Sequence, residues 1–337
     1  TSDLLYGEPM VDEQMVCVSG DDNLPDMLLG RFAVDNPTDL SHAIQRTINY
    51  EAQIADRPWW KRCYFINGGF NSIEHETFYQ QSEALIDNLI KPSGPGWHVK
   101  KTYKATEGHE PGIYTDEIMA HLNRGIGLVN YFGHAGTWSW EAMLDFDDLA
   151  GLNNTNRNPF ICSMTCNTSR FANPALQCFG ERLMATDNVD TGAVAVWGGC
   201  NFGGFWSDYY LAYFFYRSLL RNRTEIVGEA ILDSKIENLV RYPSYAIIIE
   251  PYVLLGDPLL RLHAPSRPQV MLAGWLDTSL TVSGGGQAVL GAFIQDPHGL
   301  DDIDRVELMY AGISTGVELR DDGLSGDFGV GDGIYGI

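Results

Sequence analysis

Apolar and polar positions follow two different periods along the middle of the chain. Short apolar runs at residues 63–68 and 126–134 are separated by longer segments, at 75–90 and 115–125, in which apolar residues recur at helical spacing. Strands and helices in turn predict a parallel sheet with crossover helices. We expect the alternation to include further strands at 97–103, 159–166 and 192–200 and further helices at 174–186, 206–221 and 224–240.

The two ends of the chain have other patterns. Residues 1–61 contain an acidic loop, a short strand and a helix at 39–54, in which Leu40, Ile44, Ile48 and Ile54 recur at roughly helical spacing. Residues 265–337 alternate in short segments with Gly-rich turns, at 279–283, 287–294 and 305–311, which is typical of a β-sandwich. Because both ends read as interior sequence, we expect a longer precursor.

The charge balance narrows the range of partners. Forty-four acidic residues against 22 basic residues give a formal net charge of −22. Such a surface repels phosphate backbones and anionic lipid head groups, so neither nucleic acid nor a membrane is an expected partner. It suits extracellular or saline surroundings and makes Ca²⁺ a natural counter-ion. No apolar stretch reaches the roughly 18 residues that a transmembrane helix needs.

Six cysteines are spread over the 337 residues. They are too sparse for a disulfide scaffold, and their spacings match no zinc finger, so at least one is available for chemistry. Cys166 and His134 stand at the carboxyl ends of two predicted strands, 32 residues apart. Functional groups collect at that edge of an open parallel sheet, and this separation fits neighbouring strands. We therefore expect the two side chains to meet.

A thiol beside a neutral imidazole is a pair suited to acyl transfer. The thiol of Cys166 passes its proton to His134, the thiolate attacks a peptide carbonyl, and the imidazolium protonates the leaving amine. Glycines around His134, in NYFGHAG, allow a sharp turn, and the amides of Ala135 and Cys166 can point at the oxyanion. A zinc hydrolase built on Cys162, Cys166 and His134 is a competing interpretation, but side chains four apart on a strand and its end do not converge.

The order of several motifs extends these observations. GDDNLPDMLLGRF with DLSHAIQRTINYE, NYFGHAGTWSW, SMTCNTSRF, FGERLM, TGAVAVWGG and LLGDPLLRL together cover roughly residues 15 to 264. This series resembles the gingipain-like family of caspase-fold cysteine peptidases, which includes sortases of a bacterial outer-membrane secretion system. The resemblance implies a caspase-like parallel-sheet α/β/α sandwich followed by an immunoglobulin-like β domain. It also implies His134 as base, Cys166 as nucleophile, and the amides of Ala135 and Cys166 as the oxyanion hole.

The resemblance implies three parts of the chain. Residues 1–61 are the C-terminal part of an N-terminal α/β subdomain, residues 62–264 are the catalytic caspase-like subdomain, and residues 265–337 are an incomplete immunoglobulin-like module.

Two positions depart from the family pattern. Where arginine-specific members have an acidic residue before a Gly pair, this chain has Asn67, which can orient an imidazole but cannot stabilise an imidazolium by charge. Near the position of the family's pocket Asp lies Ser72, with Glu74 as the nearest acid, so arginine specificity is not implied. Trp197 and Trp206 can wall a cleft for an apolar or aromatic side chain, or be ordinary core or edge residues.

Two acidic, Gly-rich loops are candidate Ca²⁺ sites. Carboxylates around tight turns supply the oxygen ligands that this cation prefers, although neither loop has the spacing of an EF-hand. The candidate ligands are Asp21, Asp22 and Asp26 in the first loop, and Asp321, Asp322, Asp327 and Asp332 in the second.

The sequence favours a secreted or bacterial cell-surface cysteine endopeptidase that hydrolyses peptide bonds through an acyl-enzyme on Cys166. Its expected partners are protein or peptide substrates, including segments of its own precursor, and structural Ca²⁺. Two alternatives stay open: a sortase-like transpeptidase that resolves the acyl-enzyme with an amine, and a catalytically silent surface or filament scaffold that keeps the peptidase fold.

Overall fold

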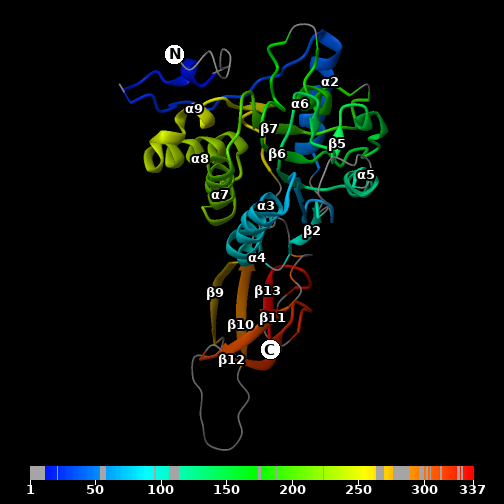
Figure 1. Ribbon diagram of the computed structural model, residues 1–337. Coiled ribbons are helices and arrows are strands. Elements are labelled where there is room, and N and C mark those ends of the chain that lie inside the picture. The colour runs from blue at the N-terminus through cyan, green and yellow to red at the C-terminus, as the bar shows by residue number, and fades with distance from the viewer. Residues whose placement is uncertain are drawn as a thin grey trace, which may run out of the picture. The chain divides into compact units, whose positions relative to one another are not determined.

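The computed structural model describes residues 12–20, 22–53, 58–94, 96–105, 114–173, 176–186, 188–222, 224–262, 269–275, 289–295, 300, 303, 305–311, 313–324, 327 and 329–337. The chain divides into two compact units, Thr1–Pro265 and Ser266–Ile337. The first unit contains a six-stranded sheet with helices on both faces, and the second contains small antiparallel sheets (Figure 1). Both features confirm the fold class expected from the sequence.

The large sheet has the strand order β2-β1-β3-β6-β7-β8. Its parallel strands are β1 (Arg62–Asn67), β2 (His98–Tyr103), β3 (Leu128–Phe132), β6 (Phe160–Met164) and β7 (Ala195–Gly199). The edge strand β8 (Tyr252–Leu255) pairs antiparallel with β7. A short hairpin of β4 (Ser139–Trp140) and β5 (Leu144–Asp145) follows β3.

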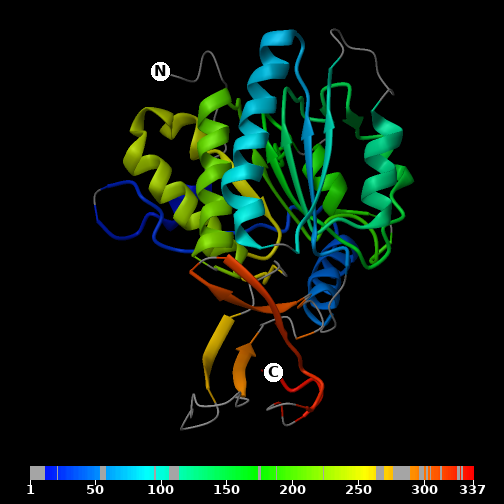
Figure 2. The same cartoon turned by 90° about the horizontal axis from the view of Figure 1, so that it is seen from below.

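Two helical layers enclose this sheet. One layer contains α3 (Ser72–Leu85), its π-helical continuation η2 (Ile86–Ile90), α4 (Lys91–Ser93), α7 (Phe205–Arg221), α8 (Val227–Arg241), η4 (Pro243–Tyr245) and α9 (Ala246–Ile249). The other contains α2 (Pro37–Glu51), α5 (Thr115–Arg124), η3 (Asp148–Gly151) and α6 (Phe179–Met184). Figure 2 shows α3 and α7 side by side across one face. Within the described residues, no helix has the length and apolar character needed to cross a membrane.

Strand periodicity distributes the core between the two layers. In β1, Cys63 and Phe65 pack into the α3/α7 layer, while Tyr64 and Ile66 pack into the α2/α5 layer. Successive side chains of a strand point to opposite faces, and here both faces are covered. Burying each large apolar side chain contributes about 1.5–3 kcal/mol, which explains why these strands are apolar throughout.

Helix α2 forms where the sequence predicts a helix, but it buries a different face. Its expected apolar stripe of Leu40, Ile44 and Ile48 is exposed, while Arg46 is almost wholly buried. The Arg46 guanidinium donates to the carbonyls of Val189, Met184 and Ala193 and to the Thr186 hydroxyl. A guanidinium with its donors satisfied tolerates burial, and this polar docking sets the orientation of the helix.

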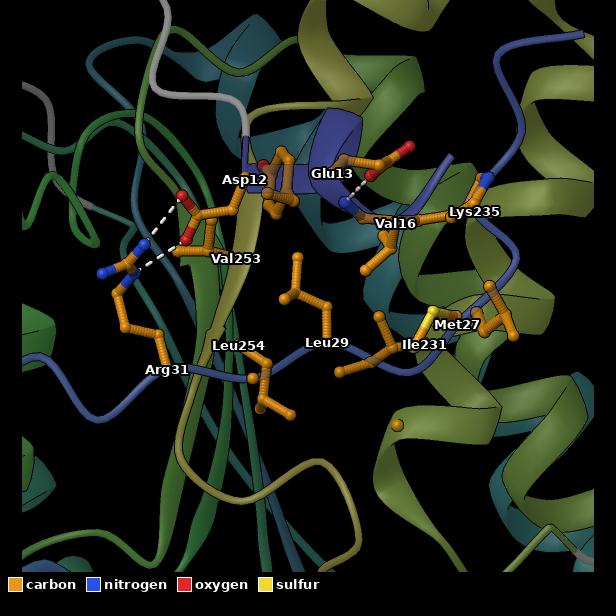
Figure 3. Close-up of a pocket in the computed structure, with 15 residues that line it drawn as sticks. Asp12, Glu13, Val16, Met27, Leu29, Arg31, Ile231, Lys235, Val253 and Leu254 are labelled. Atoms are coloured by element: carbon orange, nitrogen blue, oxygen red, sulfur yellow. Dashed lines mark hydrogen bonds and ion pairs between the residues drawn. The ribbon is translucent and has the colours of Figure 1, made fainter. Parts of the chain in front are cut away.

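The segment before α2 lies against the outer edge of the sheet. It begins with η1 (Asp12–Val16), and its Arg31 N–H donates to the Leu254 carbonyl while its carbonyl accepts from the Gly256 N–H. Figure 3 shows an apolar cavity beneath it, with the bidentate Asp12–Arg31 pair on one side and the buried Glu13–Lys235 pair on the other. Leu29, Ile231 and Leu254 line the cavity between them.

The second unit is built from antiparallel pairs. Strands β9 (Gln269–Trp275), β10 (Leu290–Gln295) and β13 (Ile334–Gly336) form one sheet, and β11 (Val306–Tyr310) pairs with β12 (Ile313–Leu319). Its small core contains Ala292, Ile294, Leu319 and Tyr335. The strands expected near 287–294 and 305–311 are present, whereas the one expected at 279–283 lies outside the described residues. The immunoglobulin-like topology stays a prediction.

Candidate active site

The two predicted chemical residues stand at the carboxyl ends of neighbouring strands. β3 and β6 pair in parallel register, with Phe132 opposite Met164, and His134 and Cys166 each follow two residues later. Both line one hollow of about 360 Å³, which includes its open mouth. The other lining residues are Phe78, Phe132, Gly133, Met164, Thr165, Gly203, Gly204, Phe205 and Asp208. The structure thus places the two side chains around the same pocket.

The backbone at His134 is fixed from two sides. The Tyr131 hydroxyl donates to the His134 carbonyl over 2.7 Å, and the Thr165 hydroxyl donates to the Gly133 carbonyl over 2.6 Å. A Cβ at residue 133 would collide with the Tyr131 hydroxyl, so this turn requires glycine. The hydrogen bond from Thr165 also ties the histidine loop to the residue directly before Cys166.

Aromatic rings and one carboxylate surround the imidazole. The His134 ring stacks on Phe70, with centroids 4.1 Å apart and planes at 2°, and meets the edges of Phe78 and Phe205. Its Nε2 lies 3.2 Å from Glu74 Oε2, which is ion-pair distance although the atoms are outside hydrogen-bond alignment. The imidazole is therefore held flat and close to a negative charge.

Glu74 sits in the first turn of α3, where the Asn71 side chain caps the helix. Burial alone would raise the pKa of Glu74, but the Phe70 N–H, 2.7 Å away, and the adjacent His134 lower it overall. The carboxyl is thus ionised at neutral pH. The sequence had marked Glu74 only as the acid nearest to the substrate pocket, and Ser72 as the pocket residue; Ser72 is exposed at the start of α3 and is not among the pocket residues.

Among the described residues, no hydrogen bond joins Asn67 to the imidazole, so the structure gives no support to the expected orienting role of this residue. It is buried at the end of β1, and its Oδ1 accepts a hydrogen bond from the Ser82 hydroxyl of α3. Its Nδ2 has no hydrogen-bond partner among the residues that the structure describes. The alternation along β1 turns this side chain into the α3 layer with Cys63 and Phe65, so the partner of His134 comes from the following helix instead.

A buried ion pair supports the Gly pair below the imidazole. Lys104 pairs with Glu141, and the second oxygen of Glu141 accepts from the Gly69 N–H over 2.7 Å. A Cβ at Gly68 would lie 2.5 Å from that oxygen, so glycine is needed for the carboxylate to approach. Sequence reasoning missed this pair because Lys104 lies after β2, remote from His134 in the chain, and Glu141 stands just beyond the histidine motif NYFGHAGTWSW.

The thiol lies deeper than the imidazole. The Gly203 N–H donates to Cys166 Sγ over 3.1 Å. Burial raises the pKa of the Cys166 thiol, the Gly203 hydrogen bond partly opposes this, and the nearby Asp208 raises the pKa further. Within the described part of the chain, no hydrogen bond is made by the N–H groups of Ala135 and Cys166, the two amides expected to form the oxyanion hole.

Asp208 is the pocket residue that sequence reasoning missed. It lies in the first turn of α7 and is almost wholly buried, and Oδ1 accepts from the Ser207 hydroxyl over 3.3 Å. Burial raises its pKa to about 7, and the Gly204 backbone and the neighbouring Tyr252 and Ser207 hydroxyls oppose this only in part. A Cβ at Gly203 would collide with Oδ2, so glycine leaves this carboxyl open to the pocket. The only sequence signal is an acid within the aromatic run FWSDYY.

The two tryptophans have different environments. Trp197 is wholly buried between Phe215 and Tyr252, so it does not wall a cleft. Its position in β7 directs the Trp197 side chain into the α7 layer. Cys162 in β6 packs into the same hydrophobic core, so it does not share a metal site with Cys166. Trp206 is 52% exposed and follows the pocket residue Phe205 at the start of α7, but it is not itself among the residues that line the pocket.

The two acidic loops differ in how their carboxylates are arranged. Asp21 lies outside the described residues, Asp22 accepts from the Leu24 N–H, and Asp26 accepts from the Val18 and Ser19 N–H groups. In the second unit, Asp321, Asp327 and Asp332 each place a carboxylate oxygen within 4.8 Å of the others, an arrangement able to hold an ion. Asp322 is outside this cluster and accepts from the Leu324 N–H.

Comparisons with known proteins show which sequences the chain resembles. Gingipain R2 of Porphyromonas gingivalis is 30% identical over 201 residues, which cover 58% of this chain and 25% of that protein. Lys-gingipain HG66 of the same organism is 25% identical over 202 residues, covering 56% of this chain and 10% of that protein. The chain therefore spans a quarter or less of the length of these curated relatives.

Solved structures show the same fold. The crystal structure of the Arg-specific cysteine proteinase gingipain R matches with a TM-score of 0.65 and 20% identity, over 84% of this chain and 65% of the other. The complex of the RgpB pro- and mature domains matches with a TM-score of 0.65 and 21% identity, over 97% and 73%. The family model of Peptidase family C25 matches residues 1–263, and the protein therefore belongs to peptidase family C25.

Proposed function

We propose that this protein is a cysteine endopeptidase in which Cys166 is the nucleophile and His134 the general base. The observation that carries this proposal is the single pocket lined by both side chains at the ends of β3 and β6. Peptidases of this family act on peptide bonds, so the expected substrates are proteins or peptides.

The contacts suggest how the steps are divided. Because burial raises the pKa of the thiol, the thiolate forms by proton transfer to His134 as the substrate binds. The Sγ atom attacks the carbonyl carbon, and the amides of Ala135 and Cys166 stabilise the oxyanion. The imidazolium, beside ionised Glu74, protonates the leaving amine, and water then hydrolyses the thioester. Glu74 thus supplies the charge that Asn67 lacks.

Asp208 supports a preference for a basic side chain next to the scissile bond. A cation entering the pocket meets a buried carboxyl that ionises when it is paired, which lowers the cost of burying either charge. One solved relative is described as Arg-specific and one curated relative is called Lys-gingipain. This proposal replaces the apolar preference expected from the tryptophans, since Trp197 is buried.

Secretion and calcium complete the proposal. The net charge of −22 and the resemblance to gingipains support a secreted or cell-surface protein. The carboxylates of Asp321, Asp327 and Asp332 supply the oxygen ligands that Ca²⁺ prefers, and we propose that this ion stabilises the second unit.

Selective labelling tests the catalytic pair. The folded protein is treated at neutral pH with a limiting amount of a thiol alkylator, and mass spectrometry maps the order in which the cysteines react. We expect Cys166 to react first, and this preference to be lost in His134→Ala but kept in His98→Ala, a matched change outside the pocket. Cys166→Ala should abolish amide hydrolysis with the fold intact, and full activity in that variant would end the proposal. Product masses with and without an added amine separate hydrolysis from transpeptidation.

A further inference from the structure

A row of aromatic side chains runs from the start of α7, next to the pocket residue Phe205, to the end of α8. It consists of Trp206, Tyr209, Tyr210, Tyr242 and Tyr245, and is called the aromatic row below. Trp206 is 52% exposed and the four tyrosines are half-buried, so each ring presents part of its surface to solvent. Three of these residues recur at helical spacing on one side of α7, while Tyr242 and Tyr245 come from the end of α8 and from η4.

The rings contact one another in sequence. Trp206 lies 6.4 Å from Tyr210 between ring centroids, Tyr210 lies 4.4 Å from Tyr242, and Tyr242 lies 5.7 Å from Tyr245. Tyr209 lies beside the first step, 6.1 Å from Trp206 and 5.3 Å from Tyr210. The aromatic surface is thus continuous.

The middle of the row is held in place. Tyr210 and Tyr242 stack with their ring centroids 4.4 Å apart and an interplanar angle of 23°. Below them Phe214 stacks on Tyr210, and the guanidinium of Arg217 lies 5.0 Å from the Phe214 ring centroid. Rings fixed in this way lose little conformational entropy when a ligand covers them.

The near end of the row adjoins the catalytic pocket. Phe205 lines the pocket and stacks on Phe78, with centroids 5.1 Å apart, while its edge meets His134. Trp206 is the next residue along the chain. A polypeptide whose carbonyl lies at Cys166 therefore has an apolar surface available on the α7 side of the pocket.

The spacing of the rings suits an extended peptide. Side chains on one face of an extended chain recur about every 6.6 Å, since each residue advances about 3.3 Å. Two of the three steps along the row, Trp206–Tyr210 at 6.4 Å and Tyr242–Tyr245 at 5.7 Å, are close to this repeat, while the stacked Tyr210–Tyr242 step between them is shorter, at 4.4 Å. The net charge of −22 disfavours an anionic membrane surface as the alternative occupant.

We propose that the aromatic row binds the stretch of substrate polypeptide that leads away from the scissile bond, and selects apolar or aromatic side chains at alternate positions of it. This rests on the proposed peptidase function for the identity of the ligand, while binding itself does not require catalysis. The substrate class is thus an unstructured or locally unfolded polypeptide with alternating apolar residues beside the cleaved bond.

Binding to the Cys166→Ala protein tests this directly. The probes are two labelled decapeptides with a central Lys, one with Phe or Leu at alternate positions and one with Ser in their place, compared by fluorescence anisotropy. We expect the alternating peptide to bind about tenfold more tightly, a difference of about 1.4 kcal/mol. The preference should disappear when Tyr210→Ser and Tyr242→Ser are combined. It should remain with Tyr79→Ser, an exposed tyrosine of α3 that contacts Tyr103 of β2 instead.

Separate results decide the two proposals. Equal affinity for both peptides, or an unchanged preference in the double variant, would overturn the role of the row, as would displacement of the peptide by a neutral oligosaccharide. Tyr245→Ser, at the far end, repeats the test if the double variant does not fold. In active protein, the double variant should raise KM for the long peptide and leave a single-residue Lys amide unaffected. If the wild-type protein cleaves neither substrate but Cys166→Ala keeps the binding preference, the proposed peptidase function is wrong, while the proposed peptide binding by the aromatic row is supported.

Discussion

Two carboxyl groups flank the candidate dyad, and their environments are opposite. Glu74, at the rim beside His134, has a lowered pKa because a backbone N–H and the imidazole outweigh its desolvation. Asp208, below Cys166, has its pKa raised to about 7 because burial dominates. One acid is therefore charged before the substrate arrives, and the other becomes charged only when a cation or rising pH favours it. Two groups of the same chemistry thus differ in pKa because hydrogen bonding and a neighbouring imidazole prevail at one and burial prevails at the other, which suits them to separate proposed tasks.

The largest expected effect separates the two acids by substrate. Asp208→Asn should lower kcat/KM for Lys and Arg substrates about 10²–10³-fold, because the buried cation loses its counter-charge. A norleucine substrate, which has the length of lysine without its charge, should change less than about threefold. Steady-state kinetics with the three substrates provides the measurement. An equal loss of kcat/KM for all of them would show that Asp208 supports the fold and does not recognise the positive charge of the substrate.

The second effect concerns stability against pH. The carboxyl of Asp208 is protonated in the folded protein up to about pH 7 but ionises near 3.8 in the unfolded chain. Its contribution to stability is therefore fully present below pH 3.8, falls by about 1.4 kcal/mol per pH unit between the two values, and is lost above pH 7. In urea unfolding from pH 4.5 to 7.5, the free energy of unfolding of Asp208→Asn should rise relative to that of wild type as pH rises. A difference between the two free energies that does not change with pH would contradict the raised pKa.

The third effect tests the charged acid. Glu74→Gln should lower kcat/KM about 10–100-fold for basic and neutral substrates alike, because the imidazolium loses its counter-charge in the transition state. The control is Glu76→Gln, two residues further along α3, where the side chain is exposed and bonded to Gln80. A loss of activity limited to basic substrates would show that Glu74 binds the basic side chain of the substrate and does not support the imidazolium.

The smallest effect involves a third kind of carboxyl environment. Asp321, Asp327 and Asp332 face one another and are bridged to backbone N–H groups. If Ca²⁺ contributes about 1 kcal/mol to a unit of this size, chelation should lower its Tm by about 4–8 °C. Calorimetry with and without chelator, on wild type and Asp327→Asn, measures the difference, and identical wild-type curves would exclude the ion.

The sequence was sufficient for the sheet and for the placement of His134 and Cys166 around one pocket, since both depend on local pattern. Apolar runs of strand length, and a polar or reactive residue after each, specify β3 with His134 and β6 with Cys166. The surrounding charges were not accessible in this way. Glu74, Asp208 and Lys104 reach the site from segments distant in sequence, and Glu141 stands just beyond the histidine motif. The ionisation of Glu74 and Asp208 depends on burial and contacts that only the folded chain defines.

Helix α2 and Trp197 show a related limit. The helical period of Leu40, Ile44 and Ile48 predicted a helix correctly but gave the wrong buried face, because four carbonyl and hydroxyl acceptors for Arg46 outweigh the apolar stripe. For Trp197, the alternation of side chains along β7 decides whether the ring faces the core or a cleft. A shift of the strand by one residue would turn the ring to the opposite face.

The segment around Arg31 has a consequence for aggregation. Strand β8 is the antiparallel edge of the sheet, and an uncovered edge offers unpaired backbone groups to another chain. The backbone hydrogen bonds of Arg31 to Leu254 and Gly256 occupy part of that edge, and the Asp12 and Glu13 ion pairs fasten the covering segment at both sides of its cavity. The segment therefore protects this edge from pairing with the edge strand of another molecule. A substitution that weakens either ion pair should cause self-association of the protein before it causes unfolding.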